Sequence, residues 1–240
     1  MHYCISDIHG LKDKYEKVLN YIKEDDTLYI LGDVIDRGKY GIDILKDIMT
    51  QKNIIFLIGN HELFLYNYLD AKEREDAIKL VETKSIWNLD CNGGKITNKI
   101  VDTLSKKEQS EIKTFLENSY LIKRVEINNK KYHLSHSYTI PYIKEDLKFK
   151  NATNQERKDV VWSSIFPRRS DPFGKTLKNT NEIYVFGHTP VQKIRNDINF
   201  EIIHDYKKAE FFDIDSGCAY QESFSRLSLF CLEDNSVKYF

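Results

Sequence analysis

Short apolar runs with the composition of β-strands recur along the chain, and this repeated pattern constrains its fold most strongly. Several of the runs are apolar at nearly every position, which is typical of strands that are buried on both faces of a sheet. Most of them are followed at once by Asp, Asn or His. The seven runs are residues 2–6, 27–32, 53–59, 130–135, 182–187, 210–215 and 226–233.

Helical patterns separate the first three of these runs. Residues 11–23 carry apolar side chains at helical spacing, and residues 41–50 and 61–69 also have a helical pattern. Alternation of strand and helix predicts parallel strands joined by right-handed crossovers. The later runs follow one another more closely, which predicts a mixed sheet. The sequence therefore indicates an α/β fold.

Two polar stretches interrupt this pattern. Residues 70–125 are charged and mostly helical in pattern, and we expect them to form an insertion within a single domain of residues 1–240. Residues 144–181 contain the longest Pro-containing loop, FPRRSDPFGK at 166–175. In α/β proteins such excursions often lie over the carboxyl ends of the strands, where ligands bind. Trp162, in the same stretch, fits the pattern of a core aromatic residue.

Metal-binding residue types follow the strand-like runs, each within three residues of the end of its run. Because the carboxyl ends of parallel strands meet at one edge of a sheet, we expect these side chains to converge in one crevice. The six residues are Asp7, His9, Asp33, Asn60, His136 and His188.

Carboxylate, amide and imidazole groups together suit Mn, Fe or Zn better than calcium, and the absence of thiolates argues against a structural zinc site. Asp7 and His9 are two residues apart, so both can reach one ion from a turn. Asp33 is the natural carboxylate to bridge two ions. Two ions roughly 3.5–4 Å apart can clamp a phosphate and generate a bridging hydroxide.

The ordered motifs SDIHG, GDVIDRG, GNHE, a histidine after a later strand, and GHTP resemble those of the calcineurin-like metallophosphoesterases. The GDxxDRG and GNHE forms point to the phosphoprotein phosphatase branch, in its short bacterial and phage version. The resemblance covers residues 3–233. It implies a β-sandwich of two mixed sheets flanked by helices, in a four-layer αββα arrangement.

The resemblance also implies roles for individual residues. One metal ion would be held by Asp7, His9 and Asp33, and the second by Asp33, Asn60, His136 and His188. His61 would be the general acid, oriented by Asp36, and Arg37 would bind phosphate oxygens as a fork-shaped donor. A metal-bridging hydroxide would attack phosphorus in line. The expected activity is that of a serine/threonine protein phosphatase with two divalent ions, Mn²⁺ in the first place and Fe or Zn as alternatives.

The sequence departs from the family pattern after Trp162. Relatives carry an arginine in a W-x-R arrangement, whereas this chain has Ser164. Arg168 or Arg169 could take over phosphate binding through a rearranged loop. The substrate class therefore stays open between a phosphorylated protein, a small phosphoester and a dinucleoside polyphosphate. The intact Asp36-Arg37-Gly38 sequence favours a phosphatase. A non-catalytic binding module is a third alternative, which the intact ligand set opposes.

Composition limits the partners. The formal net charge of −1 gives no general attraction to nucleic acid or to a membrane surface. Residues 1–10 lack the pattern of a signal peptide, and no apolar run reaches the length of a membrane span. The four cysteines form no CxxC pair. We therefore expect a cytoplasmic protein that binds neither nucleic acid nor membrane.

Overall fold

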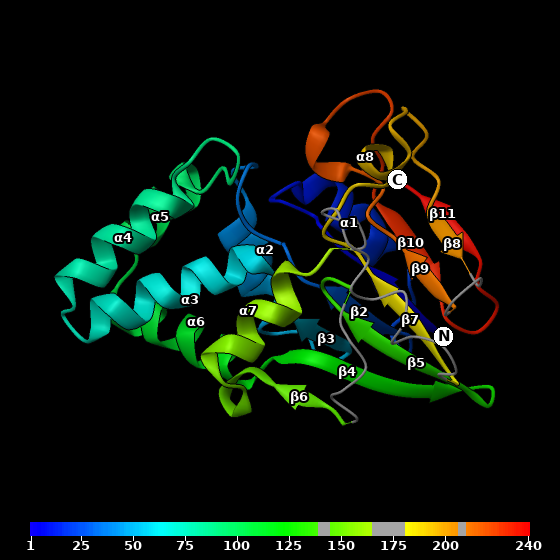
Figure 1. The fold of residues 1–240 in the computed structure, drawn as a ribbon, viewed down its shortest axis with the longest axis horizontal. Coiled ribbons are helices and arrows are strands. Elements are labelled where there is room, and N and C mark those ends of the chain that lie inside the picture. Colours follow the sequence, from blue (N-terminus) through cyan, green and yellow to red (C-terminus); the bar gives the residue numbers. More distant parts are fainter. Residues whose placement is uncertain (139–144, 165–180, 206–209) are drawn as a thin grey trace.

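One continuous mixed sheet forms the centre of the computed structural model, which describes residues 1–138, 145–164, 181–205 and 210–240 (Figure 1). Its strands are β1 (His2–Ile5), β2 (Thr27–Leu31), β3 (Ile54–Leu57), β4 (Tyr120–Ile127), β5 (Lys130–Ser135), β6 (Leu147–Lys148), β7 (Glu182–Phe186), β8 (Ile203–Asp205), β9 (Phe211–Asp213), β10 (Ser228–Cys231) and β11 (Val237–Tyr239). They lie in the order β11-β10-β1-β2-β3-β4-β5-β7-β9-β8, and β6 pairs with β4.

The amino-terminal third of the chain has the predicted alternation of strand and helix. Helices α1 (Lys12–Tyr21), α2 (Gly41–Ile48) and α3 (Asn60–Glu73) follow β1, β2 and β3, and these three strands pair in parallel. The later strands mix both directions, because β4 pairs antiparallel with β5 whereas β5, β7 and β9 pair in parallel. The expected mixed α/β architecture is confirmed.

The sheet curls so that its two halves enclose a second hydrophobic core between them, separate from the core under the helices. Along β2, Leu28 and Ile30 face the core beneath the helices, while Tyr29 and Leu31 face the other core, as the two-residue period of a strand requires. In that second core, side chains of β1, β2 and β3 pack with those of β5, β7 and β9. The two layers of the sandwich are continuous through the short pairing of Leu57 on β3 with Tyr120 on β4.

A group of helices extends from one end of the sheet, formed by the chain between β3 and β4 (Figure 1). Besides α3, it contains α4 (Ala77–Trp87), α5 (Lys95–Thr103) and α6 (Lys106–Asn118). The remaining described helices are α7 (Asn154–Trp162), α8 (Val191–Arg195) and the single turns Phe149–Asn151 and Cys218–Tyr220. Within the described ranges, no helix combines the length and the apolar character that are needed to cross a membrane.

Candidate active site

The turns that follow the strands have an unusual backbone conformation. Six of their residues have positive φ angles between 47° and 76°, in the left-handed region that residues other than glycine rarely adopt. Such strain costs on the order of 1–3 kcal/mol per residue and persists where the surrounding structure enforces it, which occurs most often at functional sites. The six are Asp7, His9, Asp33, Asp36, Arg37 and His188.

Two glycines allow these turns to approach one another closely. A Cβ atom on Gly59 would lie 2.1 Å from Asp33 Oδ1, and one on Gly187 would lie 2.3 Å from Asp7 Oδ2. Neither position therefore has room for a side chain. The backbone N–H of His188 also donates to Asp7 Oδ2 at 2.9 Å. The turns after β1, β2, β3 and β7 are thereby packed into one site.

Asp33 lies at the centre of this site. Its Oδ2 atom is 3.4 Å from His136 Nε2, 3.6 Å from His61 Nε2 and 3.8 Å from His9 Nε2. His9 Nε2 is also 3.9 Å from Asp7 Oδ1. Two groups of potential ligands share Asp33: one adds His9 and His61, and the other adds His136 and His188. The structure thus brings together the residues that the strand-end pattern predicted, with Asp33 between two clusters.

The hydrogen bonds of the histidines suit metal binding. His136 Nδ1 donates to the carbonyl oxygen of Leu31 at 2.7 Å, and His9 Nδ1 donates to that of Ile35 at 3.0 Å. A carbonyl oxygen only accepts, so Nδ1 carries the proton in each neutral ring; Nε2, which faces Asp33, then has the lone pair that can bind a cation. His136 Nε2 also lies 3.0 Å from Asn60 Oδ1 and 3.2 Å from His188 Nδ1. This convergence of nitrogen and oxygen ligand atoms fits a divalent cation.

The charges of the site also favour a cation. Burial raises the pKa of Asp7 to about 6, and the nearby charge of Asp33 adds to this effect although His136 opposes it. Burial would lower the pKa of His136, but Asp33 and Asp7 outweigh it and raise the pKa to about 10. Two buried carboxylates therefore create a strong demand for positive charge at this place.

His61 belongs to a second hydrogen-bonded unit beside this cluster. Its Nδ1 atom lies 2.6 Å from Asp36 Oδ2, and its Nε2 atom faces Asp33. Burial opposes protonation of His61, but the Asp33 and Asp36 carboxylates outweigh it and raise its pKa. The same Asp36 oxygen accepts a hydrogen bond from Trp87 Nε1 at 2.6 Å.

Arg37 is exposed at the edge of the site, and no carboxylate in the described part of the chain pairs with it. Its backbone N–H donates to Gly93 O at 3.2 Å. The guanidinium is therefore available to an anionic ligand. Ser164 occupies the position where the resemblance implies a second arginine, and the two proposed replacements, Arg168 and Arg169, lie outside the described residues.

The prediction that Trp162 belongs to the core is wrong, because 44% of its surface is exposed. Its ring lies edge-on to His188 with 5.9 Å between ring centroids, and 5.7 Å from the ring of Phe64. The residue ends α7, and the helical pattern did not reveal that this last turn reaches the rim of the site. Trp162 thus offers an aromatic surface beside the candidate metal ligand His188.

Glu62, the last residue of the GNHE motif, has a role that the strand-end pattern does not predict. Its buried carboxylate accepts backbone N–H groups of Gly59, Asp33 and Val34 at 2.8–2.9 Å, and that of Ile35 at 3.3 Å. It thereby ties the turn after β2 to the start of α3. Its position three residues after Gly59, where the glutamate of a capping box stands, is the signal that could have identified it.

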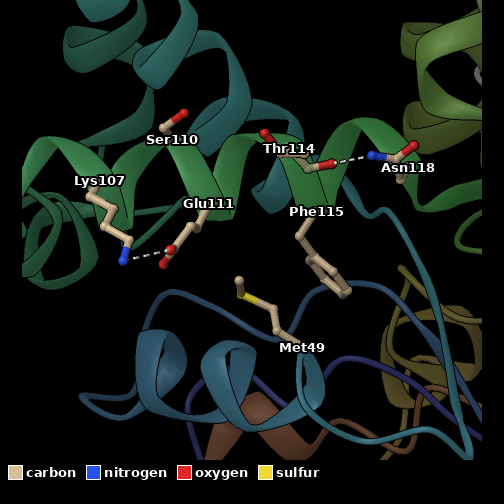
Figure 2. Close-up of a pocket in the computed structure, with 7 residues that line it drawn as sticks. All are labelled: Met49, Lys107, Ser110, Glu111, Thr114, Phe115 and Asn118. Atoms are coloured by element: carbon tan, nitrogen blue, oxygen red, sulfur yellow. Dashed lines mark hydrogen bonds and ion pairs between the residues drawn. The ribbon is translucent and has the colours of Figure 1, made fainter.

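A separate pocket lies between the end of α2 and one face of α6 (Figure 2). Met49 and Phe115 supply its apolar surface, and Lys107 pairs with Glu111 on its rim at 3.8 Å. None of the residues that line it belongs to the metal cluster or to the His61–Asp36 unit. The strand-end site is therefore the place where the candidate chemistry is concentrated.

Comparison with known proteins gives several matches. The chain is 37% identical over 67 residues to the symmetrical bis(5'-nucleosyl)-tetraphosphatase of Acidovorax ebreus (strain TPSY), which covers 26% of this chain and 24% of that protein. It is 29% identical over 139 residues to serine/threonine-protein phosphatase 2 of Salmonella typhimurium, and this match covers 56% of this chain and 57% of that protein. The chain spans 24–32% of the length of the first curated relatives that it matches.

A solved structure described as a putative diadenosine tetraphosphatase has the same fold, with a TM-score of 0.60 at 16% identity, covering 100% of this chain and 92% of that one. The family of calcineurin-like phosphoesterases matches residues 3–215. This match spans most of the chain and includes all six residues that are predicted to bind metal. The chain belongs to the calcineurin-like phosphoesterase family.

Proposed function

We propose that the protein is a phosphomonoesterase that uses two divalent metal ions and acts on phosphoserine or phosphothreonine in proteins. The observation that carries this proposal is the position of Asp33 Oδ2, within 3.4–3.8 Å of the Nε2 atoms of three histidines from different turns. Imidazole nitrogens grouped around a carboxylate oxygen form a ligand set that Mn, Fe and Zn accept.

Asp33 would bridge the two ions. The first would also be held by Asp7 and His9, and the second by Asn60, His136 and His188. Mn²⁺ is the proposed ion, with Fe or Zn as alternatives that the same donor set would accept. When bound, such a pair supplies Lewis-acid activation of water and of phosphate oxygens.

His61 would hold a proton at Nε2 and give it to the leaving oxygen of the substrate. Its Nδ1 atom is fixed by Asp36, and its Nε2 atom points toward the metal cluster, where the ester bond would lie. The raised pKa of His61 supports this role, because an acid must be protonated before it can donate. Arg37 would bind phosphate oxygens that do not react, which orients the phosphoryl group.

Two observations support a protein substrate. Arg37 and Trp162 are exposed at the rim, so a phosphorylated side chain on a larger molecule could approach them. The similarity to the Salmonella protein phosphatase also extends over more of this chain than that to the Acidovorax tetraphosphatase.

A dinucleoside polyphosphate hydrolase is the second candidate. The relatives named as symmetrical tetraphosphatases support it, and so does the exposed ring of Trp162, which could stack on a nucleobase. Both candidates use the same metal cluster and differ in what lies beyond the phosphate.

The test compares three substrates with Mn²⁺-loaded protein: p-nitrophenyl phosphate, a phosphoserine peptide and diadenosine tetraphosphate. We expect the peptide to be hydrolysed with a higher kcat/KM than the dinucleotide. Asp33→Asn should abolish turnover of all three, whereas Asp43→Asn, the same change on the exposed side of α2, should leave it intact. Preference for the dinucleotide would favour the second candidate, and full activity of Asp33→Asn would refute both.

A further inference from the structure

Two buried N–H groups donate to a single oxygen of Asp36. His61 Nδ1 and Trp87 Nε1 each lie 2.6 Å from Asp36 Oδ2. Asp36 and Trp87 are both fully buried, and the other carboxylate oxygen of Asp36 has no hydrogen-bond partner in the described part of the chain. The position of Oδ2 therefore depends on both donors, and Trp87 acts on the same atom that holds His61.

The helical group outside the sheet supplies this contact. Trp87 is the last residue of α4, and Thr97 on α5 accepts the backbone N–H of Asp36 at 3.1 Å. Between them, Gly93 accepts the backbone N–H of Arg37. One segment, residues 87–97, thus holds both the side chain and the backbone of the Asp36-Arg37 turn.

The close fit of the indole shows that its orientation is fixed. A Cβ atom on Gly94 would lie 2.3 Å from the ring of Trp87, so only glycine leaves room for the ring at this position. On another side the ring packs against Tyr68, with 5.7 Å between ring centroids. Because the ring is enclosed, its N–H has one direction available, and that direction leads to Asp36.

We infer that Trp87 is a positioning residue for proton transfer by His61. It does not reach the substrate. It fixes Asp36 Oδ2, and Asp36 in turn fixes the ring of His61 and the direction of its Nε2 atom. This inference rests on the proposed role of His61 as the general acid. It assigns to the helical segment after α3 a part in the reaction that acts through Asp36.

A purely structural role for Trp87 makes a different prediction. If the indole only filled the core, its loss would lower stability and would reduce the turnover of all substrates alike. If it positions the acid, its loss should matter only when the leaving group needs a proton. Phenyl phosphate has a poor leaving group that depends on an acid, whereas 2,4-dinitrophenolate leaves readily without one.

The test uses Trp87→Phe, which keeps an aromatic ring and removes the N–H. With Mn²⁺, we expect kcat for phenyl phosphate to fall about tenfold, part of the 10²–10⁴-fold that general acid catalysis typically contributes. KM for phenyl phosphate and kcat for 2,4-dinitrophenyl phosphate should stay unchanged. Tyr68→Phe is the matched control, because it removes a buried-ring hydroxyl bonded to Asp102 without touching Asp36. Tyr68→Phe should leave kcat unchanged for both substrates.

A second measurement needs neither turnover nor a variant of Trp87. The chain has two tryptophans, so its NMR spectrum has two indole N–H signals, and Trp162→Phe assigns them. The Trp87 signal should lie downfield of the Trp162 signal and exchange slowly with solvent. Asp36→Asn should shift it, whereas Tyr68→Phe should leave it close to its original position.

The outcomes separate this inference from the proposed function. His61→Asn should show the same dependence on the leaving group as Trp87→Phe, and a larger loss. If His61→Asn slows both substrates equally, the acid role fails and the inference fails with it. If His61→Asn behaves as expected but Trp87→Phe slows both substrates equally or neither, only the inference is overturned. An indole signal that ignores Asp36→Asn overturns it as well.

Discussion

Replacing Glu62 by glutamine should destabilise the protein, because this carboxylate joins two turns of the site. Oε2 accepts the backbone N–H groups of Asp33 and Gly59, and Oε1 accepts those of Val34 and Ile35. Glutamine keeps one oxygen and replaces the other by an NH₂ group. Two of the four backbone donors would then face another donor in a site that is fully closed to solvent.

The size of the effect follows from three contributions. Two lost hydrogen bonds to a charged group cost roughly 3–6 kcal/mol, and a new buried donor without an acceptor costs about 1–3 kcal/mol. The neutral amide also avoids a cost. Burial, with the charge of Asp33, raises the pKa of Glu62 from 4.5 to about 7, although the Asp33 and Gly59 N–H groups lower it. This rise corresponds to roughly 3 kcal/mol of charge burial. The net loss should be roughly 1–6 kcal/mol.

The assay is denaturant unfolding at pH 7 in the presence of EDTA, so that bound metal does not contribute to stability. Glu108→Gln is the matched control, because Glu108 occupies the same position at the start of α6 but is only partly buried and accepts only one backbone N–H, that of Ser105. The loss of stability in Glu108→Gln should be clearly smaller than that in Glu62→Gln. A Glu62→Gln variant as stable as the wild type would refute the reasoning, since the four contacts would then be worth no more than the cost of burying the charge.

Three further predictions address other parts of the structure. Gly59→Ala should displace Asp33, whose Oδ1 lies 2.1 Å from the added Cβ atom, and metal titration should show weaker binding; unchanged affinity would contradict the packing described. Hydrogen bonding from His133 and the Arg124 guanidinium lowers the pKa of Glu182 to about 2, so its charge stabilises the fold above pH 4.5 and this contribution is lost as the pH falls toward 2. The thermal unfolding midpoint of Glu182→Gln should therefore be lower than that of the wild type at pH 6, and the two midpoints should converge at pH 2. The same difference in midpoint at both pH values would contradict the stabilising role of the Glu182 charge. Trp162→Ala should raise KM for diadenosine tetraphosphate if the ring stacks on a base, and an unchanged KM would remove that support for the second candidate function.

The convergence of the candidate metal ligands could be predicted from the sequence because it follows from topology. Asp7, Asp33 and Asn60 each come directly after a strand of an apparent β-α-β unit, and parallel strands bring their carboxyl ends to one edge. No contact between distant residues has to be known for that inference. The helices after β1, β2 and β3 were predicted correctly from their own apolar spacing.

The features that sequence reasoning missed depend on packing between distant segments. Trp87 lies 51 residues from Asp36, and nothing in the pattern of a charged helix says which core it enters. Trp162 has the spacing of a core residue, but its exposure depends on what covers the end of α7. The four contacts of Glu62 likewise require two turns to meet in space. The periodicity of a local sequence carries no information about such tertiary contacts.

The central claim, that two metal ions share Asp33, is tested most directly by counting bound Mn²⁺ and recording its electron paramagnetic resonance spectrum. We predict two ions per chain with a spectrum of magnetically coupled Mn²⁺, because a bridging carboxylate holds such ions roughly 3.5–4 Å apart. Asp33→Asn should abolish the coupling. Binding of a single ion, or of two ions with uncoupled spectra, would contradict the claim.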